Sequence, residues 1–206
     1  MNDKRYYEKF ALYSLESLFK EEFAHFVCAE SPDLQDDFDN IGIEVTRGIS
    51  DYEGRFKRLC NECTERNLSL KARFKQANRM FRKNFLGVFH ESNGWVITDP
   101  SYGKRKEKFH VETILEKIEI KSDKLERIYK KFNVNGLYIF AEFPLNLLDI
   151  VLIASKISKR PLSFDYYFIN VPGKLYFINA NDGCTVRKID FSPGAWQKFV
   201  EKAKQI

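Results

Sequence analysis

The N-terminal part of the chain contains one helical and one strand-like pattern of apolar residues. Apolar side chains recur at intervals of three or four residues over 4–24, which predicts an amphipathic helix. The odd positions of 41–46 are isoleucine or valine and alternate with glycine and polar residues, so a strand with one buried face is expected there. Glu44 lies on the other face of this strand. A carboxylate at such a position is unusual, because a buried charge is costly unless it is paired or binds a metal.

The remaining patterns predict a mixed β-sheet flanked by helices, in an α/β or α+β fold. Asn93-Gly94 and Pro172-Gly173 indicate tight turns between paired strands. The run 137–141 is apolar throughout, which is typical of a central strand buried on both faces. The further predicted strands are 26–29, 85–90, 95–98, 164–171, 174–179 and 185–189, and the further helices are 52–63, 70–83, 111–120, 122–132, 144–158 and 194–204. We expect one domain over residues 1–206.

Composition narrows the class of protein without deciding its function. A chain of 206 residues with 44% hydrophobic content can form one sizeable core. The net charge of +5 is compatible with a nucleic-acid partner. No apolar run is long enough to span a membrane, and the N-terminus lacks the apolar core of a secretory signal. Four cysteines in a chain of this length do not indicate a disulfide framework, so we expect a cytoplasmic protein with no membrane contact.

An acidic segment lies just before the strand that carries Glu44. Asp33 is the first of the aspartates in 33–39, and a preceding strand or turn can bring it back beside Glu44. Two carboxylates that converge at the end of a sheet form a hard-oxygen site, which suits Mg²⁺ or Mn²⁺. The alternative is an acidic hairpin loop followed by an ordinary strand whose glutamate faces solvent.

The same residues carry a resemblance to a known family. Pro32-Asp33 followed by Glu44-Val45-Thr46, with an amphipathic acidic helix in front, resembles the signature of the PD-(D/E)xK nuclease superfamily. The resemblance implies a single nuclease-like domain with a restriction-endonuclease-like core, in which Asp33 and Glu44 hold the divalent metal. In that superfamily a lysine two residues after the glutamate usually helps to position or activate the attacking water. This chain departs from the pattern, because Thr46 occupies the lysine position.

The resemblance also suggests residues that would complete the site. The first helix of the superfamily often supplies a glutamate, which would be Glu8 or, as a second choice, Glu16, bound to the metal directly or through water. Gln35 would orient water through its amide. Lys57, on the following helix, would replace the absent lysine, as migrated lysines do in some relatives. In the alternative interpretation, Glu8 and Glu16 are boundary residues that pair with lysines one helical turn away.

Two basic segments are candidates for contact with a nucleic-acid backbone. Lys71, Lys75 and Arg79 recur at intervals of four residues, and the helix predicted around them contains no acidic partner. Like charges at this spacing repel each other, so the stripe fits a surface that phosphates neutralise. Lys104 and Arg105 lie in a polar loop between aromatic residues, which can grip a backbone and stack on a base. A solvated helix face and a plain exposed loop are the alternatives.

The sequence therefore predicts a metal-dependent nuclease that hydrolyses phosphodiester bonds of DNA or RNA with Mg²⁺ or Mn²⁺. The expected catalytic residues are Asp33, Glu44, Thr46, Gln35 and Lys57. Two alternatives stay open at this point. One is a nuclease-fold module with a degraded site that binds nucleic acid or a protein partner without cleavage. The other is a structural or interaction domain in which the acidic loop has no chemical role.

Overall fold

The computed structural model describes residues 3–20, 22–49, 86–90, 94–98, 108–141, 143–160 and 163–205. Contacts divide the chain into two compact units, Met1–Gly48 with His110–Ile206, and Ile49–Phe109. In the second unit the structure describes an antiparallel hairpin of β4 (Leu86–His90) and β5 (Gly94–Thr98), which confirms the hairpin predicted from Asn93-Gly94. The expectation of one nuclease-like domain over the whole chain stays a prediction.

The first unit is built around one seven-stranded mixed sheet, as expected for an α+β protein. Its strands follow the order β1-β2-β3-β6-β7-β8-β9. Their bounds are Val27–Cys28 for β1, Leu34–Asp36 for β2, Ile41–Arg47 for β3, Val134–Phe140 for β6, Tyr166–Val171 for β7, Lys174–Asn179 for β8 and Thr185–Asp190 for β9. The three central strands β3, β6 and β7 are parallel, and the outer strands pair antiparallel. The fully apolar run at 137–141 therefore supplies a central strand, as its pattern predicts.

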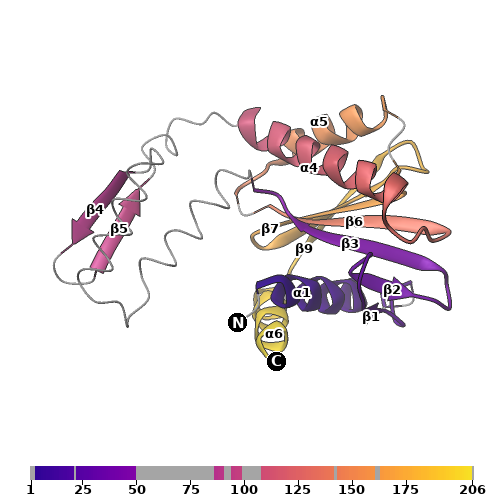
Figure 1. The fold of residues 1–206 in the computed structure, drawn as a ribbon, viewed down its shortest axis with the longest axis horizontal. Helices are drawn as coiled ribbons and strands as arrows, with labels where there is room; N and C mark the ends of the chain where they lie inside the picture. Colours follow the sequence, from indigo (N-terminus) through magenta and orange to yellow (C-terminus); the bar gives the residue numbers. More distant parts are fainter. Residues whose placement is uncertain are drawn as a thin grey trace. The chain divides into compact units, whose positions relative to one another are not determined.

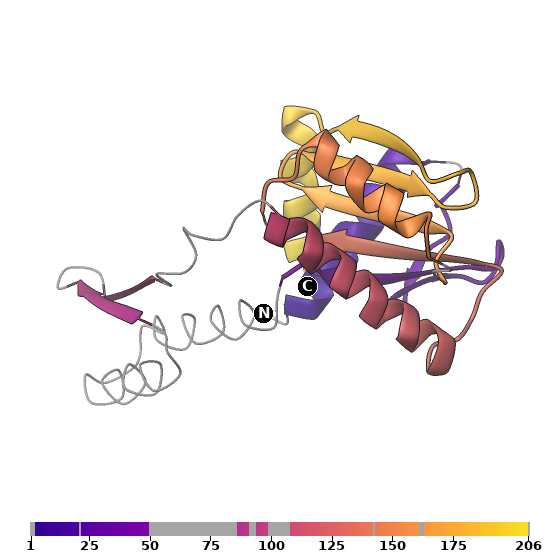
Figure 2. The same ribbon diagram turned by 90° about the horizontal axis from the view of Figure 1, so that it is seen from above.

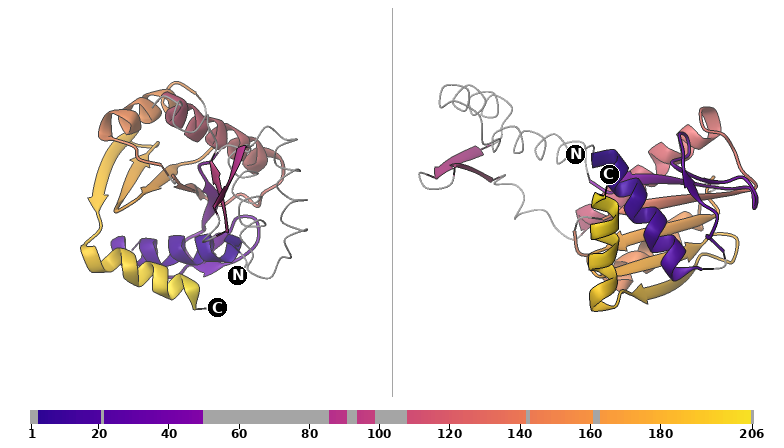
Figure 3. Two further views of the ribbon diagram at one scale, coloured as in Figure 1. Left: turned by 90° about the vertical axis from the view of Figure 1, so that its left-hand side faces the viewer. Right: turned by 90° about the horizontal axis from the view of Figure 1, so that it is seen from below.

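Helices cover both faces of this sheet. The helices are α1 (Asp3–Leu18), α4 (Lys108–Arg127), α5 (Leu147–Ile157) and α6 (Pro193–Lys204). Figure 1 shows α4 and α5 on one face, with α1 and α6 on the other, and Figure 3 shows the same layers end on. Alternation along β6 accounts for the two layers: Tyr138 belongs to the core under α1, whereas Leu137 and Ile139 belong to the core under α4 and α5.

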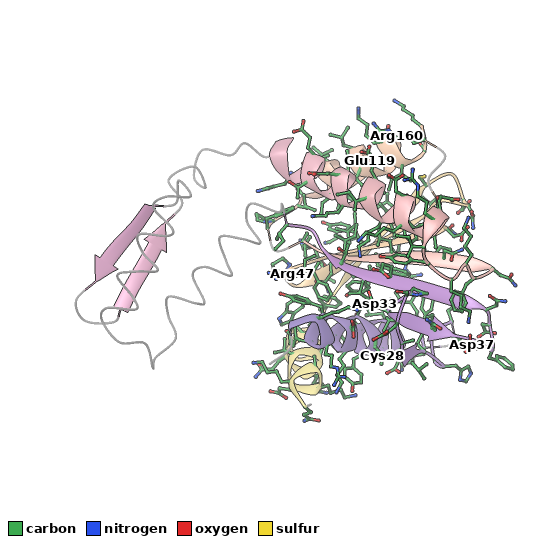
Figure 4. The ribbon with its side chains drawn as sticks, in the orientation of Figure 1. Cys28, Asp33, Asp37, Arg47, Glu119 and Arg160 are labelled. Carbon is green, nitrogen blue, oxygen red and sulfur yellow. The ribbon has the colours of Figure 1, made fainter. Side chains whose placement is uncertain are left out.

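The two helices of the upper layer lie side by side (Figure 2), and a surface ion pair joins them. Glu119 of α4 contacts Arg160, three residues beyond the end of α5 (Figure 4). Both side chains are exposed, so the pair contributes little to stability. The shared apolar core beneath the helices therefore holds this layer in place.

Helix α1 is fixed against the sheet by aromatic packing and by one buried polar network. The Phe10 ring lies 5.4 Å from that of Phe140 in β6 and 4.9 Å from that of Trp196 in α6. The Tyr138 hydroxyl is within 2.9 Å of Ser14 Oγ and accepts a 2.6 Å hydrogen bond from Asn170 Nδ2. Because buried polar groups need partners, this network fixes the orientation of α1 as well as its distance from the sheet.

One pair of predicted helices is wrong, because α4 is a single continuous helix where two were expected over 111–120 and 122–132. Its buried side chains Ile114, Ile118 and Leu125 keep the helical spacing through the expected break. Ser122 is therefore a buried residue within the helix and does not cap a second one. The helix ends at Arg127, five residues before the predicted end.

Two helix termini also differ from the prediction. Helix α1 ends at Leu18, and the segment after it turns so that Phe19 and Phe23 pack into the core without a continuous helix. Helix α5 begins at Leu147, after Asn146 and Asp149 form a reciprocal capping box. This box, and not Pro144, sets the start of α5. The predicted helices over 52–63 and 70–83 lie outside the described residues. None of the described helices combines the length and the apolarity that a membrane crossing needs.

Candidate functional site

The hairpin of β2 and β3 brings the predicted acidic pair together. Leu34 pairs with Ile43 in an antiparallel register, so the next position of the same register places Asp33 across from Glu44. Asp33 lies one residue before β2 begins, and its charge acts on Glu44. The hairpin thus returns Asp33 to the neighbourhood of Glu44.

Asp33 is buried at the open edge of β3, where the short β2 strand has ended. Asp33 is only 2% exposed, and its Oδ2 accepts a 2.9 Å hydrogen bond from the backbone N–H of Val45. This bond satisfies a strand N–H that lacks a neighbouring strand. It also fixes the carboxylate between α1 and β3, as Figure 4 shows.

Helix α1 contributes a second carboxylate and a lysine. Glu8, the predicted first-helix acid, is only 7% exposed. The Lys4 ammonium lies 3.2 Å from Glu8 Oε1 and 3.0 Å from Asp33 Oδ1, so one cation joins the two acids. The alternative interpretation, in which Glu8 pairs with a lysine one turn away, is confirmed by this ion pair. The role of Glu8 as a metal ligand stays a prediction.

Helix α4 supplies the lysine and the tyrosine that contact Glu44, from the face of the sheet opposite α1. The Lys121 ammonium lies 2.5 Å from Glu44 Oε1, and the Tyr129 hydroxyl donates a 3.0 Å hydrogen bond to the same oxygen. Lys121 Nζ is also 3.4 Å from the Tyr129 hydroxyl oxygen. Glu44 is 5% exposed and does not face solvent, so the alternative of an ordinary solvated strand residue is wrong. This carboxylate has instead the paired environment that a buried charge requires.

Burial and the negative charge of Asp33 both raise the pKa values of the two glutamates, Glu8 and Glu44. Burial, with the Asp33 charge as a further cause, raises the pKa of Glu44, and the neighbouring Lys121 limits that rise. Burial likewise raises the pKa of Glu8, with opposition from Lys4 and support from Asp33. The hydrogen bond to Asp33 is the main cause that raises the pKa of Lys4. An additional positive charge would stabilise the ionised form of both glutamates.

The carboxylates of this group are ligands that suit a hard divalent cation. In this structure Lys4 and Lys121 neutralise them. Asp33, Glu44 and Glu8 offer carboxylate oxygens, which Mg²⁺ and Mn²⁺ prefer. The Lys4 ammonium forms ion pairs with both Asp33 and Glu8, so it already supplies a positive charge between these two carboxylates. Within the described part of the chain, no group of three or more Asp, Glu, His or Cys side chains is arranged to hold a metal ion. A metal at this site therefore requires Lys4 to move.

The other predicted residues of the first third have different surroundings. Gln35 Nε2 donates to the backbone carbonyls of Glu30 and Pro32, at 3.2 and 3.0 Å, and so braces the loop before Asp33. Thr46 is half-buried on β3 and shares the strand face of Glu44. Glu16 lies about two turns beyond Glu8 on α1. Burial raises the pKa of Glu16, and the charge of Lys202 in α6 opposes that rise.

The remaining aspartates of the acidic segment build the hairpin turn. Asp36 Oδ1 accepts hydrogen bonds from the backbone N–H groups of Phe38 and Asp39, at 2.9 and 3.1 Å. Asp37 forms an exposed 2.8 Å ion pair with Lys130. Of the acidic segment, Asp33 alone contacts the site in the part of the chain that is described. The expected basic and catalytic residues Lys57, Lys71, Lys75, Arg79, Lys104 and Arg105 lie outside the described residues.

The sequence did contain a signal for Lys121, which our residue-by-residue prediction missed. Lys121 follows Ile114 by seven residues and Ile118 by three, so it lies on the buried stripe of α4. A lysine on such a stripe is a candidate for a buried ion pair. The break predicted at this point removed it from consideration. Tyr129 lies beyond the end of the helix, and no local pattern places it on Glu44.

Gly42→Ala should destabilise the fold and displace the loop that carries Asp33. A Cβ at Gly42 would lie 2.5 Å from Phe132 Cδ2 and 2.7 Å from Pro32 Cγ, both of which are ring atoms. Such overpacking lowers the free energy of unfolding by about 1–3 kcal/mol, which chemical denaturation measures. Because Pro32 precedes Asp33, we also expect weaker Mn²⁺ binding in calorimetry.

Gly194→Ala is the matched control for this substitution. A Cβ at Gly194 meets nothing within 4 Å, and the residue lies in helix α6. Alanine is the better helix former by about 1 kcal/mol, so the control should be neutral or stabilising. Equal stabilities of the Gly42→Ala variant and the original protein would show that Pro32 and Phe132 move aside freely.

Comparison with known proteins identified no relative of this chain. No protein-family profile, no curated protein and no solved structure matches the chain. The candidate function therefore depends on the geometry of Asp33, Glu44, Glu8, Lys4 and Lys121.

Proposed function

We propose that the chain is a metal-dependent nuclease with a site of the PD-(D/E)xK type, in which the motif lysine is replaced by Lys121. The observation that carries this proposal is the Lys121 ammonium 2.5 Å from Glu44 Oε1, a carboxylate on which the charge of the buried Asp33 also acts. In this proposal a lysine of α4 compensates for the absence of a lysine at position 46. Lys121 takes the role for which sequence reasoning suggested Lys57.

The order of elements around the site supports a restriction-endonuclease-like core. The acidic helix α1 precedes the β2–β3 hairpin, and the hairpin carries Asp33 and Glu44 on neighbouring strands. The chain then returns through α4 to β6, which lies parallel to β3. Helix α4 thus packs on the sheet face of Glu44, where a lysine at position 121 reaches that carboxylate.

Asp33 and Glu44 are the residues that would hold the metal, with Glu8 as a third acid. A divalent ion supplies a Lewis acid that polarises a phosphoryl oxygen and lowers the pKa of an attacking water. Lys121 lies beside Glu44 and remains a hydrogen-bond donor and a positive charge. It can orient water through its ammonium hydrogens and stabilise the negative charge that develops on the phosphate.

Tyr129 supports this arrangement by holding Glu44 in one orientation. Burial and the nearby Glu44 carboxylate both raise the pKa of the Tyr129 hydroxyl, so it stays protonated and donates. Its hydrogen bond and the Lys121 ion pair both reach Glu44 Oε1. Among the described residues, Oε2 of Glu44 accepts no hydrogen bond, which makes this oxygen the better candidate for a metal.

The proposal is tested by incubating the purified protein with labelled DNA and RNA, single-stranded and duplex, with and without Mg²⁺ or Mn²⁺. We expect cleavage that requires the metal and is lost in Glu44→Gln, which keeps the side-chain shape and removes the charge. Asp37→Asn is the control, because Asp37 is exposed on the hairpin turn and pairs with Lys130.

The same assay separates the proposed function from its alternative. A protein that binds one of these nucleic acids with the metal and cleaves none of them would be the degraded module that binds without cleavage. Absence of both binding and cleavage would remove the nucleic-acid partner from the proposal. Thermal unfolding of Glu44→Gln should stay cooperative, which shows that a loss of cleavage reports on the site.

A further inference from the structure

A pocket of about 460 Å³ lies between α1 and β1, directly beside the proposed metal site. The residues that line it are Lys4, Arg5, Glu8, Lys9, Cys28, Ala29 and Glu30. It shares Lys4 and Glu8 with the group around Asp33, so the pocket and the acids are continuous. Figure 4 shows Cys28 and Asp33 in this part of the molecule.

The charge of the α1–β1 pocket depends on what neutralises its acids. Lys4, Arg5 and Lys9 give it three cations, and Glu8 and Glu30 give it two carboxylates. Lys9 Nζ donates a 2.9 Å hydrogen bond to the carbonyl of Gln205, which keeps it at the edge of the pocket. With Lys4 committed to Glu8 and Asp33, the pocket has little excess positive charge. A divalent ion on these acids would leave it strongly positive.

Lys4 is the residue that this change affects most. Its ammonium lies 3.0 Å from Asp33 and 3.2 Å from Glu8, so a metal on either carboxylate competes with it directly. The Lys4 side chain is 64% exposed, whereas those of Asp33 and Glu8 are 3% and 10% exposed. The acids are therefore fixed in the fold, and the lysine can rotate into the pocket without disturbing the core.

We propose that Lys4 is a phosphate-binding residue whose ammonium leaves Asp33 and Glu8 for the backbone of a nucleic-acid strand in the α1–β1 pocket when a divalent metal binds. This inference rests on the proposed function and adds to it the path of the strand. It also makes the metal and the strand cooperative ligands, because each one favours the same position of Lys4.

The experiment compares the original protein with Lys4→Met, Lys4→Arg and the control Lys20→Met, which alters an exposed lysine beyond the end of α1. Calorimetry measures Mn²⁺ affinity in the absence of nucleic acid. Fluorescence anisotropy measures the binding of labelled DNA and RNA strands, either with Ca²⁺, a hard cation that takes oxygen ligands, or with no divalent ion. Thermal unfolding of each variant verifies that it folds.

The two affinities should change in opposite directions. Lys4→Met should bind Mn²⁺ about fivefold more tightly, since two partly exposed ion pairs no longer compete with the metal. Its strand affinity in Ca²⁺ should fall about fivefold, and the salt dependence should weaken by about one phosphate contact. Without a divalent ion the substitution should leave strand binding unchanged. Lys4→Arg should retain strand binding in Ca²⁺.

Several outcomes would overturn the inference. Weaker or unchanged Mn²⁺ binding by Lys4→Met would show that Lys4 only supports the acids, and unchanged strand binding in Ca²⁺ would show that it does not reach phosphate. If the original protein binds Mn²⁺ and strands cooperatively but cleaves none, the proposed nuclease function fails and the role of Lys4 stands. Absence of Mn²⁺ binding by the original protein removes both.

Discussion

Lys121→Met should lower the rate of metal-dependent strand cleavage by about 10²–10³-fold, the usual cost of removing one preorganised electrostatic group. The substitution keeps the length and the apolar stem of the side chain and removes the charge that lies 2.5 Å from Glu44. Single-turnover kinetics with saturating Mn²⁺ isolate the chemical step from metal binding. Lys124→Met, an exposed lysine three residues further along α4, is the control and should cleave normally.

A second substitution tests whether Lys121 occupies the role of the missing motif lysine. Thr46 lies two residues after Glu44, on the same face of β3. The double variant Lys121→Met with Thr46→Lys places an ammonium at the motif position and should recover part of the lost rate. Full cleavage by Lys121→Met alone would show that the ion pair with Glu44 has no catalytic role. A lost rate with no recovery would indicate that Lys121 also holds Glu44 in place.

Phe10→Ala should lower the free energy of unfolding by about 3–5 kcal/mol, as truncations of buried phenylalanines do. Phe10 is 1% exposed, and its ring contacts the rings of Phe140, Trp196 and Phe199 with centroid distances of 4.9 to 5.7 Å. These contacts join α1 to the sheet and to α6. Chemical denaturation followed by far-ultraviolet circular dichroism measures the loss.

Phe38→Ala is the matched control for this prediction. Phe38 is 85% exposed on the hairpin turn, so its truncation should change stability by less than about 0.5 kcal/mol. Because α1 also carries Glu8 and Lys4, Phe10→Ala should weaken Mn²⁺ binding even in buffers where the protein remains folded. A loss below about 1 kcal/mol would show that α1 is held by the Tyr138 network and not by aromatic packing.

The local elements of this protein follow from short patterns in its sequence. Alternation along 41–46 predicts the strand with Ile43 and Val45 on the α1 side and Glu44 on the other, as the structure has it. The apolar run at 137–141 predicts the central strand β6, and Pro172-Gly173 predicts the β7–β8 hairpin, where Gly173 has a φ of 83°. Such patterns are readable because each depends on neighbours within a few residues.

The proximity of Asp33 to Glu44 depends partly on local sequence and partly on tertiary structure. A hairpin is a local structure, so the sequence indicates that the two acids can meet. Apart from the resemblance carried by Pro32-Asp33, the alternation pattern does not distinguish Asp33 from Asp36, which caps the turn by accepting hydrogen bonds from Phe38 and Asp39. The register of β2 on β3 makes that distinction, because it leaves the N–H of Val45 for Asp33.

The tertiary structure alone decided which cations accompany the acids. Glu44 is separated from Lys121 by 77 residues and from Tyr129 by 85, and these contacts exist because α4 packs on the face of β3 that carries Glu44. Lys4 reaches Asp33 because α1 packs beside the edge of the same strand. Periodicity assigns a side chain to a face of its own element, whereas the packing of whole elements determines which faces meet.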